Sequence, residues 1–168
     1  AATYCNLGVA LKELGQLDEA VDRYRKALAI RPDLAEAHNN LGNVFRDLGR
    51  LDEAVGSYRK ALAIESDSAE ALSNLGNALQ EQGKLDESVT SYQRALKIKP
   101  DDAKAFNNIR LSLLPICHDI ITNQRDASSI EQIIDSLPTP PEPDILRLQF
   151  KSLTGGNTQE AWKSVIGN

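Results

Sequence analysis

The sequence contains no methionine, only two cysteines and few aromatic residues, and no apolar run in it approaches the length that spans a membrane. Cys5 and Cys117 belong to no CxxC pair, so the spacing offers neither a disulfide framework nor a zinc site. No signal peptide is recognisable, and the chain opens at Ala1 without a methionine. The two unpaired cysteines fit reduced thiols in a cytoplasmic protein, and a periplasmic location stays open as the alternative. We expect the chain to be a fragment of something longer, so the missing targeting signals say little about location.

Charge and motifs exclude several classes of function. The net charge is -5 and no segment is strongly basic, which argues against a nucleic-acid partner. No phosphate-binding loop, GxSxG motif or metal-spaced histidine cluster occurs. Cys117 and His118 are adjacent, and neighbours on a helix point about 100° apart, so they form no nucleophile–base pair. We predict no catalytic residue, no metal and no cofactor.

One phrase of sequence recurs three times at a spacing of 34 residues. It reads CNLGVALKELGQLDEA from Cys5, NNLGNVFRDLGRLDEA from Asn39 and SNLGNALQEQGKLDES from Ser73. Apolar residues three and four apart give two helical stripes in each copy, which we name helix A and helix B of the unit. The recurring residues are Leu7, Leu41 and Leu75; Gly8, Gly42 and Gly76; Gly15, Gly49 and Gly83; Tyr24, Tyr58 and Tyr92; and Ala27, Ala61 and Ala95.

The glycines and the charged residues in this frame predict local structure. A glycine inside helix A costs about 1 kcal/mol against alanine, so Gly8, Gly42 and Gly76 indicate close approach of helix B. We expect the facing residues to be the small ones at Ala20, Ala54 and Ser88. The second glycine of each unit suits a left-handed residue that ends helix A.

Acidic residues are expected at the starts of the helices. Asp18, Asp52 and Asp86 fall in the first turn of helix B, where the helix dipole favours negative charge. Asp33 with Glu36, and Asp67 with Glu70, have the spacing of capping boxes for the next helix A, and the third unit lacks this box. His38, at a position usual for an aromatic residue, is read as a helix-packing histidine.

This pattern resembles the tetratricopeptide repeat (TPR), whose period is 34 residues. The resemblance implies an all-α fold, a right-handed superhelical solenoid of antiparallel helix hairpins, because one hairpin cannot bury its apolar face alone. It predicts three units at 1–34, 35–68 and 69–102. Residues 103–137 read as a capping helix or a degenerate fourth hairpin, with Pro115 ending or kinking its first helix. Residues 138–144 read as a proline-rich connector, and 145–168 as a partial, degenerate hairpin.

The resemblance also implies where a ligand binds. In TPR proteins, positions two, five, six, nine and twelve of helix A line a concave groove. An amide side chain both donates and accepts, so it can pair with any peptide backbone. Asn6, Asn40, Asn74 and Asn108 repeat at the period of the units, similar to the ladder in O-linked N-acetylglucosamine transferases. The predicted peptide-binding residues are Asn6, Lys12, Asn39, Asn40, Asn43, Arg46, Ser73, Asn74, Asn77, Gln80, Asn107 and Asn108, with Val9, Glu36, Glu70 and Lys104 beside them.

The ladder has an alternative interpretation, because asparagine at position six is common in TPR proteins and can bond within the stack. One binding mode of the family is not expected here. Chaperone-binding members hold a terminal carboxylate with a Lys/Asn/Asn/Lys/Arg set, and only Asn40 agrees with it. The five corresponding places hold Cys5, Val9, Asn40, Glu70 and Asn74.

We predict a noncatalytic interaction module that binds a protein or peptide segment in its groove. Two alternatives stay open. One is the substrate-recruiting N-terminal region of a larger enzyme, such as a glycosyltransferase or sulfotransferase. The other is a scaffold that self-associates.

Overall fold

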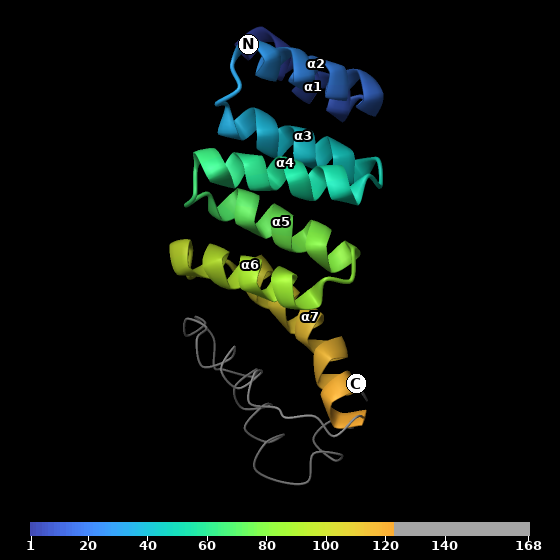
Figure 1. The fold of residues 1–168 in the computed structure, drawn as a ribbon, viewed down its shortest axis with the longest axis vertical. Helices are drawn as coiled ribbons and strands as arrows, with labels where there is room; N and C mark the ends of the chain where they lie inside the picture. Colours follow the sequence, from blue (N-terminus) through green and yellow to red (C-terminus); the bar gives the residue numbers. More distant parts are fainter. Residues whose placement is uncertain (123–168) are drawn as a thin grey trace.

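The structure is a computed structural model that describes residues 1–122, and this part of the chain consists of helices and short connections. The hairpins are α1 (Ala2–Glu13) with α2 (Leu17–Ile30), α3 (Ala35–Asp47) with α4 (Leu51–Ile64), and α5 (Ala69–Glu81) with α6 (Leu85–Ile98). Helix α7 (Ala103–Thr122) follows and packs on α6. The hairpins stack in chain order along one axis, so each helix touches the next (Figure 1). The predicted all-α solenoid of antiparallel hairpins is confirmed.

Each A helix ends in the same way. Gly15, Gly49 and Gly83 have φ of 75°, 72° and 75°, the left-handed conformation that the sequence predicts. The amide of Gly49 donates to the carbonyl oxygen of Arg46 at 2.8 Å, and the amide of Arg50 donates to that of Phe45 at 2.8 Å. These paired bonds satisfy the last carbonyls of α3 and turn the chain back into α4.

The starts of the helices agree with the prediction in part. Acidic pairs lie in the first turns of α2, α4 and α6, as expected. The predicted capping boxes are wrong, because α3 and α5 begin one residue later than Asp33 and Asp67 require. The N-cap of α3 is Leu34, with no side-chain bond, and that of α5 is Ser68, whose Oγ accepts from the Ala71 amide. At the end of the third unit, where the sequence predicts no capping box, Asp102 Oδ1 accepts from the Ala105 amide at 3.1 Å.

The core is built around one tyrosine per hairpin. Tyr24, Tyr58 and Tyr92 are 1%, 0% and 0% exposed. These rings, and not Ala20, Ala54 and Ser88, lie against the glycines of helix A, so the predicted partners of the glycines were wrong. The crossing places the tyrosine, one turn farther along helix B, over the bare backbone of the glycine. Ala20, Ala54 and Ser88 are nevertheless fully buried, at 0% exposed.

For the first helix after the third hairpin, the sequence predicts that Pro115 either ends or kinks it. The helix does not end there, because α7 continues to Thr122 with Pro115 inside it. Phe106, Ile109 and Leu113 are buried on its inner face. The helix expected at Ser128–Leu137, the connector at 138–144 and the hairpin at 145–168 lie outside the described residues.

Candidate functional site

The asparagines of the described chain all lie on A helices. They occupy α1, α3, α5 and α7, and none is found on α2, α4 or α6. The structure gives these predicted groove residues different bonding partners. Within residues 1–122, some of these amides bond within the stack, and others make no bond to it.

Two of the asparagines hold the buried tyrosines. The hydroxyl of Tyr58 donates to Asn43 Oδ1 at 2.8 Å, and that of Tyr92 donates to Asn77 Oδ1 at 2.6 Å. The Tyr92 hydroxyl also donates to Gln80 Oε1 at 3.2 Å. Desolvation by burial raises the pKa of Tyr92 to about 12, so the hydroxyl keeps its proton and its donor role at pH values where an exposed tyrosine ionises. Asn43, Asn77 and Gln80 therefore connect helix A to helix B of their own hairpin.

Asn39 connects one hairpin to the next. It is 8% exposed, and its Oδ1 accepts from Asn74 Nδ2 at 3.1 Å. Its Nδ2 in turn donates to Glu70 Oε1 at 2.9 Å. Glu70 and Asn74 are one turn apart on α5, so this single side chain of α3 meets two side chains of the neighbouring helix. The bonds fix the spacing of α3 and α5 and hold the Glu70 carboxylate in place.

The asparagine ladder is split by these bonds. Asn74 donates to Asn39, and Asn108 Nδ2 donates to Asn77 Oδ1 at 3.0 Å. Both of these asparagines therefore bond to the preceding A helix. Asn40 makes no side-chain hydrogen bond within the described residues. The repeat explains this difference, because α1 has Cys5 and Val9 where α3 and α5 offer asparagine acceptors.

The charged residues of the groove form a chain of ion pairs. Lys12 Nζ lies 3.4 Å from Asp47 Oδ2, Arg46 lies 4.0 Å from the other oxygen of Asp47, and Arg46 Nε lies 3.9 Å from Glu81 Oε1. The chain runs across α1, α3 and α5 near the ends of these helices. Lys12 and Arg46, two predicted site residues, are therefore already neutralised by acidic neighbours. Such partly exposed pairs stabilise the stack by roughly 0–1 kcal/mol each.

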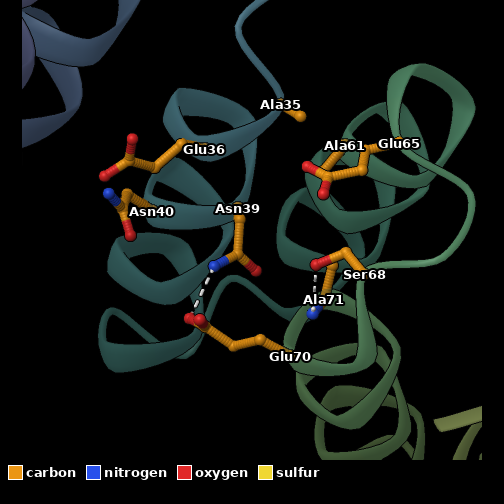
Figure 2. A pocket seen from close by; sticks show the side chains of 9 residues that line it. All are labelled: Ala35, Glu36, Asn39, Asn40, Ala61, Glu65, Ser68, Glu70 and Ala71. Atoms are coloured by element: carbon orange, nitrogen blue, oxygen red, sulfur yellow. Dashed lines mark hydrogen bonds between the residues drawn. The ribbon is translucent and has the colours of Figure 1, made fainter. Parts of the chain in front are cut away.

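A pocket of about 290 Å³ opens at the opposite end of the A helices. Figure 2 shows Glu36 and Asn40 projecting from α3, and Asn39 reaching across to Glu70 of α5. Glu65, just after the end of α4, completes the acidic lining. The lining residues are Ala35, Glu36, Asn39, Asn40, Ala61, Glu65, Ser68, Glu70 and Ala71.

The carboxylates of this pocket differ in their partners from those at the other end of the groove. Within the described residues, no ion pair involves Glu36, Glu65 or Glu70, whereas the acids at the other end of the groove are paired. The hydrogen bond that Glu70 accepts comes from the neutral amide of Asn39. Within residues 1–122, this pocket therefore holds three carboxylates that no ion pair balances.

The sequence did not place Glu65 or Ser68 at the site, because both belong to the connection between two units. A signal was present in the case of Glu65. The same position holds a basic residue in the other units, Arg31 and Lys99, so a carboxylate here reverses the charge of the turn.

The remaining predicted residues lie apart from the pocket. Asn6 is exposed, and Asn107 is exposed and accepts from Arg110 at 2.9 Å. The Oγ of Ser73 is buried with no hydrogen-bond partner among the described residues. His38 Nε2 lies 2.9 Å from the carbonyl oxygen of Pro32, so this histidine ties α3 to the preceding turn.

Reactive groups are scarce in the part of the chain that the structure describes. Burial raises the pKa of the Cys5 thiol, which keeps it protonated and poorly nucleophilic. Residues 1–122 contain no group of three acidic, histidine or cysteine side chains placed to hold a metal ion. Among the helices in this range, none is both long enough and apolar enough to cross a membrane.

Comparison with known proteins gives a family and a fold. The family model described as the TPR repeat matches residues 8–46, 42–83 and 76–109. No curated protein matches the chain. Among solved structures, "First TPR of Spaghetti (RPAP3) bound to HSP90 peptide SRMEEVD" is similar with a TM-score of 0.68 and 24% identity, covering 69% of this chain and 92% of that one.

Two further structures have the same fold. The first TPR domain of human RPAP3 aligns with a TM-score of 0.67 and 24% identity, covering 70% of this chain and 92% of that one. The Arabidopsis OM64 TPR domain aligns with a TM-score of 0.64 and 22% identity, covering 66% and 92%. At these identities the likeness concerns the fold alone.

Proposed function

Because this chain belongs to the tetratricopeptide-repeat family, we propose that it is a noncatalytic module that binds a protein or peptide segment in the groove of its A helices. The observation that carries the proposal is the Asn40 side chain. It lines a pocket, it makes no hydrogen bond within the described residues, and its equivalents Asn74 and Asn108 are bonded within the stack. An amide held at a pocket wall offers a donor and an acceptor to a peptide backbone.

The neighbours support a peptide as the class of ligand but not its identity. The similar structures include one bound to the HSP90 peptide SRMEEVD and one in complex with the HSP70 peptide SGPTIEEVD. Both peptides end in acidic residues. In this chain the places that would hold a terminal carboxylate contain no cation, and one of them is Glu70. We therefore do not expect this groove to bind such peptides.

An array of random-sequence peptides tests the proposal. Purified protein should retain a subset of peptides, and Asn40→Ala should weaken their binding by about 0.5–1.5 kcal/mol, the worth of a hydrogen bond. Gln16→Ala is the control, since it deletes an exposed amide in the turn between α1 and α2. An array that retains no peptide, or binding that is indifferent to Asn40, would contradict the proposal.

The two alternatives, a recruiting region of a larger enzyme and a self-associating scaffold, remain predictions. Both would use the same stack, and the first would use the same groove. Neither has a specific contact in the described residues that favours it over the module.

A further inference from the structure

The pocket beside Asn40 also has a chemical preference, and this inference rests on the proposed function of the groove. We propose that the pocket takes a cationic side chain, a lysine or an arginine, of the bound segment. The pocket and the unpartnered amide define where a ligand side chain enters. The charges around them decide which kind of side chain is stabilised there.

The first argument is the balance of charge along the groove. At one end, Lys12 and Arg46 are paired with Asp47 and Glu81. At the other end, Glu36, Glu65 and Glu70 surround the pocket without a cation of their own among residues 1–122. A ligand therefore meets compensated charges at the first end and unbalanced negative charge at the second. A cation gains attraction from all three carboxylates, and an anion is repelled by them.

The second argument is that the pocket is organised for a donor. The Glu70 carboxylate is oriented by Asn39, which is itself held by Asn74, so one acidic wall is positioned before any ligand arrives. Asn40 projects from α3 beside Glu36, and its side-chain oxygen adds a neutral acceptor to the lining of the pocket (Figure 2). Lysine and arginine carry only donors, and they satisfy carboxylate and amide oxygens together. The volume of about 290 Å³ leaves room for the aliphatic stem of such a side chain.

First-turn glutamates also stabilise their own helices, so the test must separate helix stability from recognition. Glu36 and Glu70 stand in the first turns of α3 and α5, but Glu65 is outside both helices. Glu36→Gln combined with Glu65→Gln removes two charges, keeps the shapes and leaves the Asn39–Glu70 bond intact. The matched control is Glu13→Gln with Glu19→Gln, which removes the same charge from residues that do not line the pocket.

The probes are four synthetic peptides of alternating glycine and serine, capped at both ends, with lysine, arginine, glutamine or glutamate at the centre. Isotope-labelled protein is titrated with each peptide and the amide resonances of residues 35–71 are followed by NMR. The lysine and arginine peptides should bind more tightly than the glutamine peptide, and the glutamate peptide should bind least. Binding of the cationic peptides should weaken as salt rises and fall at least about threefold in the Glu36/Glu65 variant, but not in the control.

Equal binding of the glutamate and lysine peptides, or equal loss in the two charge variants, would overturn the inference while leaving a peptide-binding groove in place. If none of the four peptides shifts a resonance, the inference is also overturned. The proposed function is tested separately, by the random-sequence array and its dependence on Asn40, so the two failures are distinguishable. Circular dichroism on every variant checks that the helices remain formed.

Discussion

A Cβ atom on Gly42 would lie 2.6 Å from Cε1 of Tyr58, so the tyrosine ring already fills the space that any side chain at residue 42 needs. The same relationship holds between Gly76 and Tyr92, where the corresponding distance is 2.6 Å. The bare backbone of each glycine lets the ring of helix B lie directly on helix A. The glycines are thus a packing requirement of the hairpin, which is why they recur in the middle of helices that they weaken.

Gly42→Leu should destabilise the fold by about 1–3 kcal/mol or more, because the ring of Tyr58 is fully buried and has no room to move aside. Urea unfolding measures the change. Gly56→Leu is the control, since a Cβ at this exposed helical glycine meets nothing within 4 Å. It should be neutral or stabilising by up to about 1 kcal/mol. Equal midpoints for the two variants would show that the crossing does not depend on Gly42.

The glycine–tyrosine pair also shows which features of the fold the sequence alone predicts. The period, the helices, the left-handed glycines and the need for close approach follow from residue types and spacing. The facing residue does not, because Ala54 and Tyr58 are one turn apart on the same face of α4, and the crossing geometry selects between them. The N-caps failed for a similar reason. A shift of one residue in a helix start replaces Asp67 with Ser68 as the cap.

The sequence predicts which residues line the candidate site. It does not predict which of their side chains are left without a hydrogen bond within the stack. Asn40 and Asn74 occupy the same position of consecutive units, and nothing in that position distinguishes them. The difference arises from the preceding unit, which offers Cys5 to one and Asn39 to the other. A hydrogen bond between repeats therefore depends on two residues from different units, and the three-dimensional stack is needed to show which two residues meet.

Asn39→Ala and Asn40→Ala should separate bracing from binding. Loss of Asn39 leaves the amide of Asn74 and the carboxylate of Glu70 without their partner, at a site where Asn39 is 8% exposed. We expect a loss of about 1–3 kcal/mol in unfolding free energy. Loss of Asn40 breaks no bond among the described residues and should leave the thermal midpoint nearly unchanged. A larger loss for Asn40→Ala than for Asn39→Ala would reverse these roles.

The buried tyrosines predict instability at high pH. Burial raises the pKa of Tyr24 to about 12 and that of Tyr92 to about 12, and it also raises the pKa of Tyr58. In the unfolded chain a tyrosine ionises near its ordinary pKa of about 10. Between about pH 10 and 12 the unfolded state therefore holds fewer protons than the folded state, and stability falls as pH rises. The stability contributed by these groups is fully present below about pH 10.

Each such tyrosine should reduce the free energy of unfolding by up to about 1.4 kcal/mol per pH unit above that point. Unfolding followed by circular dichroism, together with tyrosinate absorbance, measures this effect. The absorbance and the loss of helix should change together. Tyrosinate absorbance that reaches its full value while the helices remain intact would contradict the burial of the hydroxyls.

Val9→Asn should give the first unit the asparagine that the third unit has at the equivalent position, residue 77. In the third unit, Asn77 Oδ1 accepts from both Tyr92 and Asn108. An asparagine at residue 9 would stand in the same relation to Tyr24 and Asn40. Val9 is 39% exposed and lies outside the core, so its replacement costs little. We expect a gain of about 0.5–1.5 kcal/mol in stability for each bond formed. The same substitution should weaken peptide binding, because Asn40 then bonds to α1 and is no longer available to a ligand.

Thermal unfolding and peptide titration on the one variant provide both readouts, and Val9→Ala is the control that removes the valine without adding an amide. Higher stability with weaker binding would show that the residue at position 9 of α1 decides whether Asn40 is available to a ligand. Weaker binding without a gain in stability would mean that Val9 itself contacts the ligand. Unchanged binding with a gain in stability would place the peptide away from Asn40, and the proposed site would then have to be abandoned.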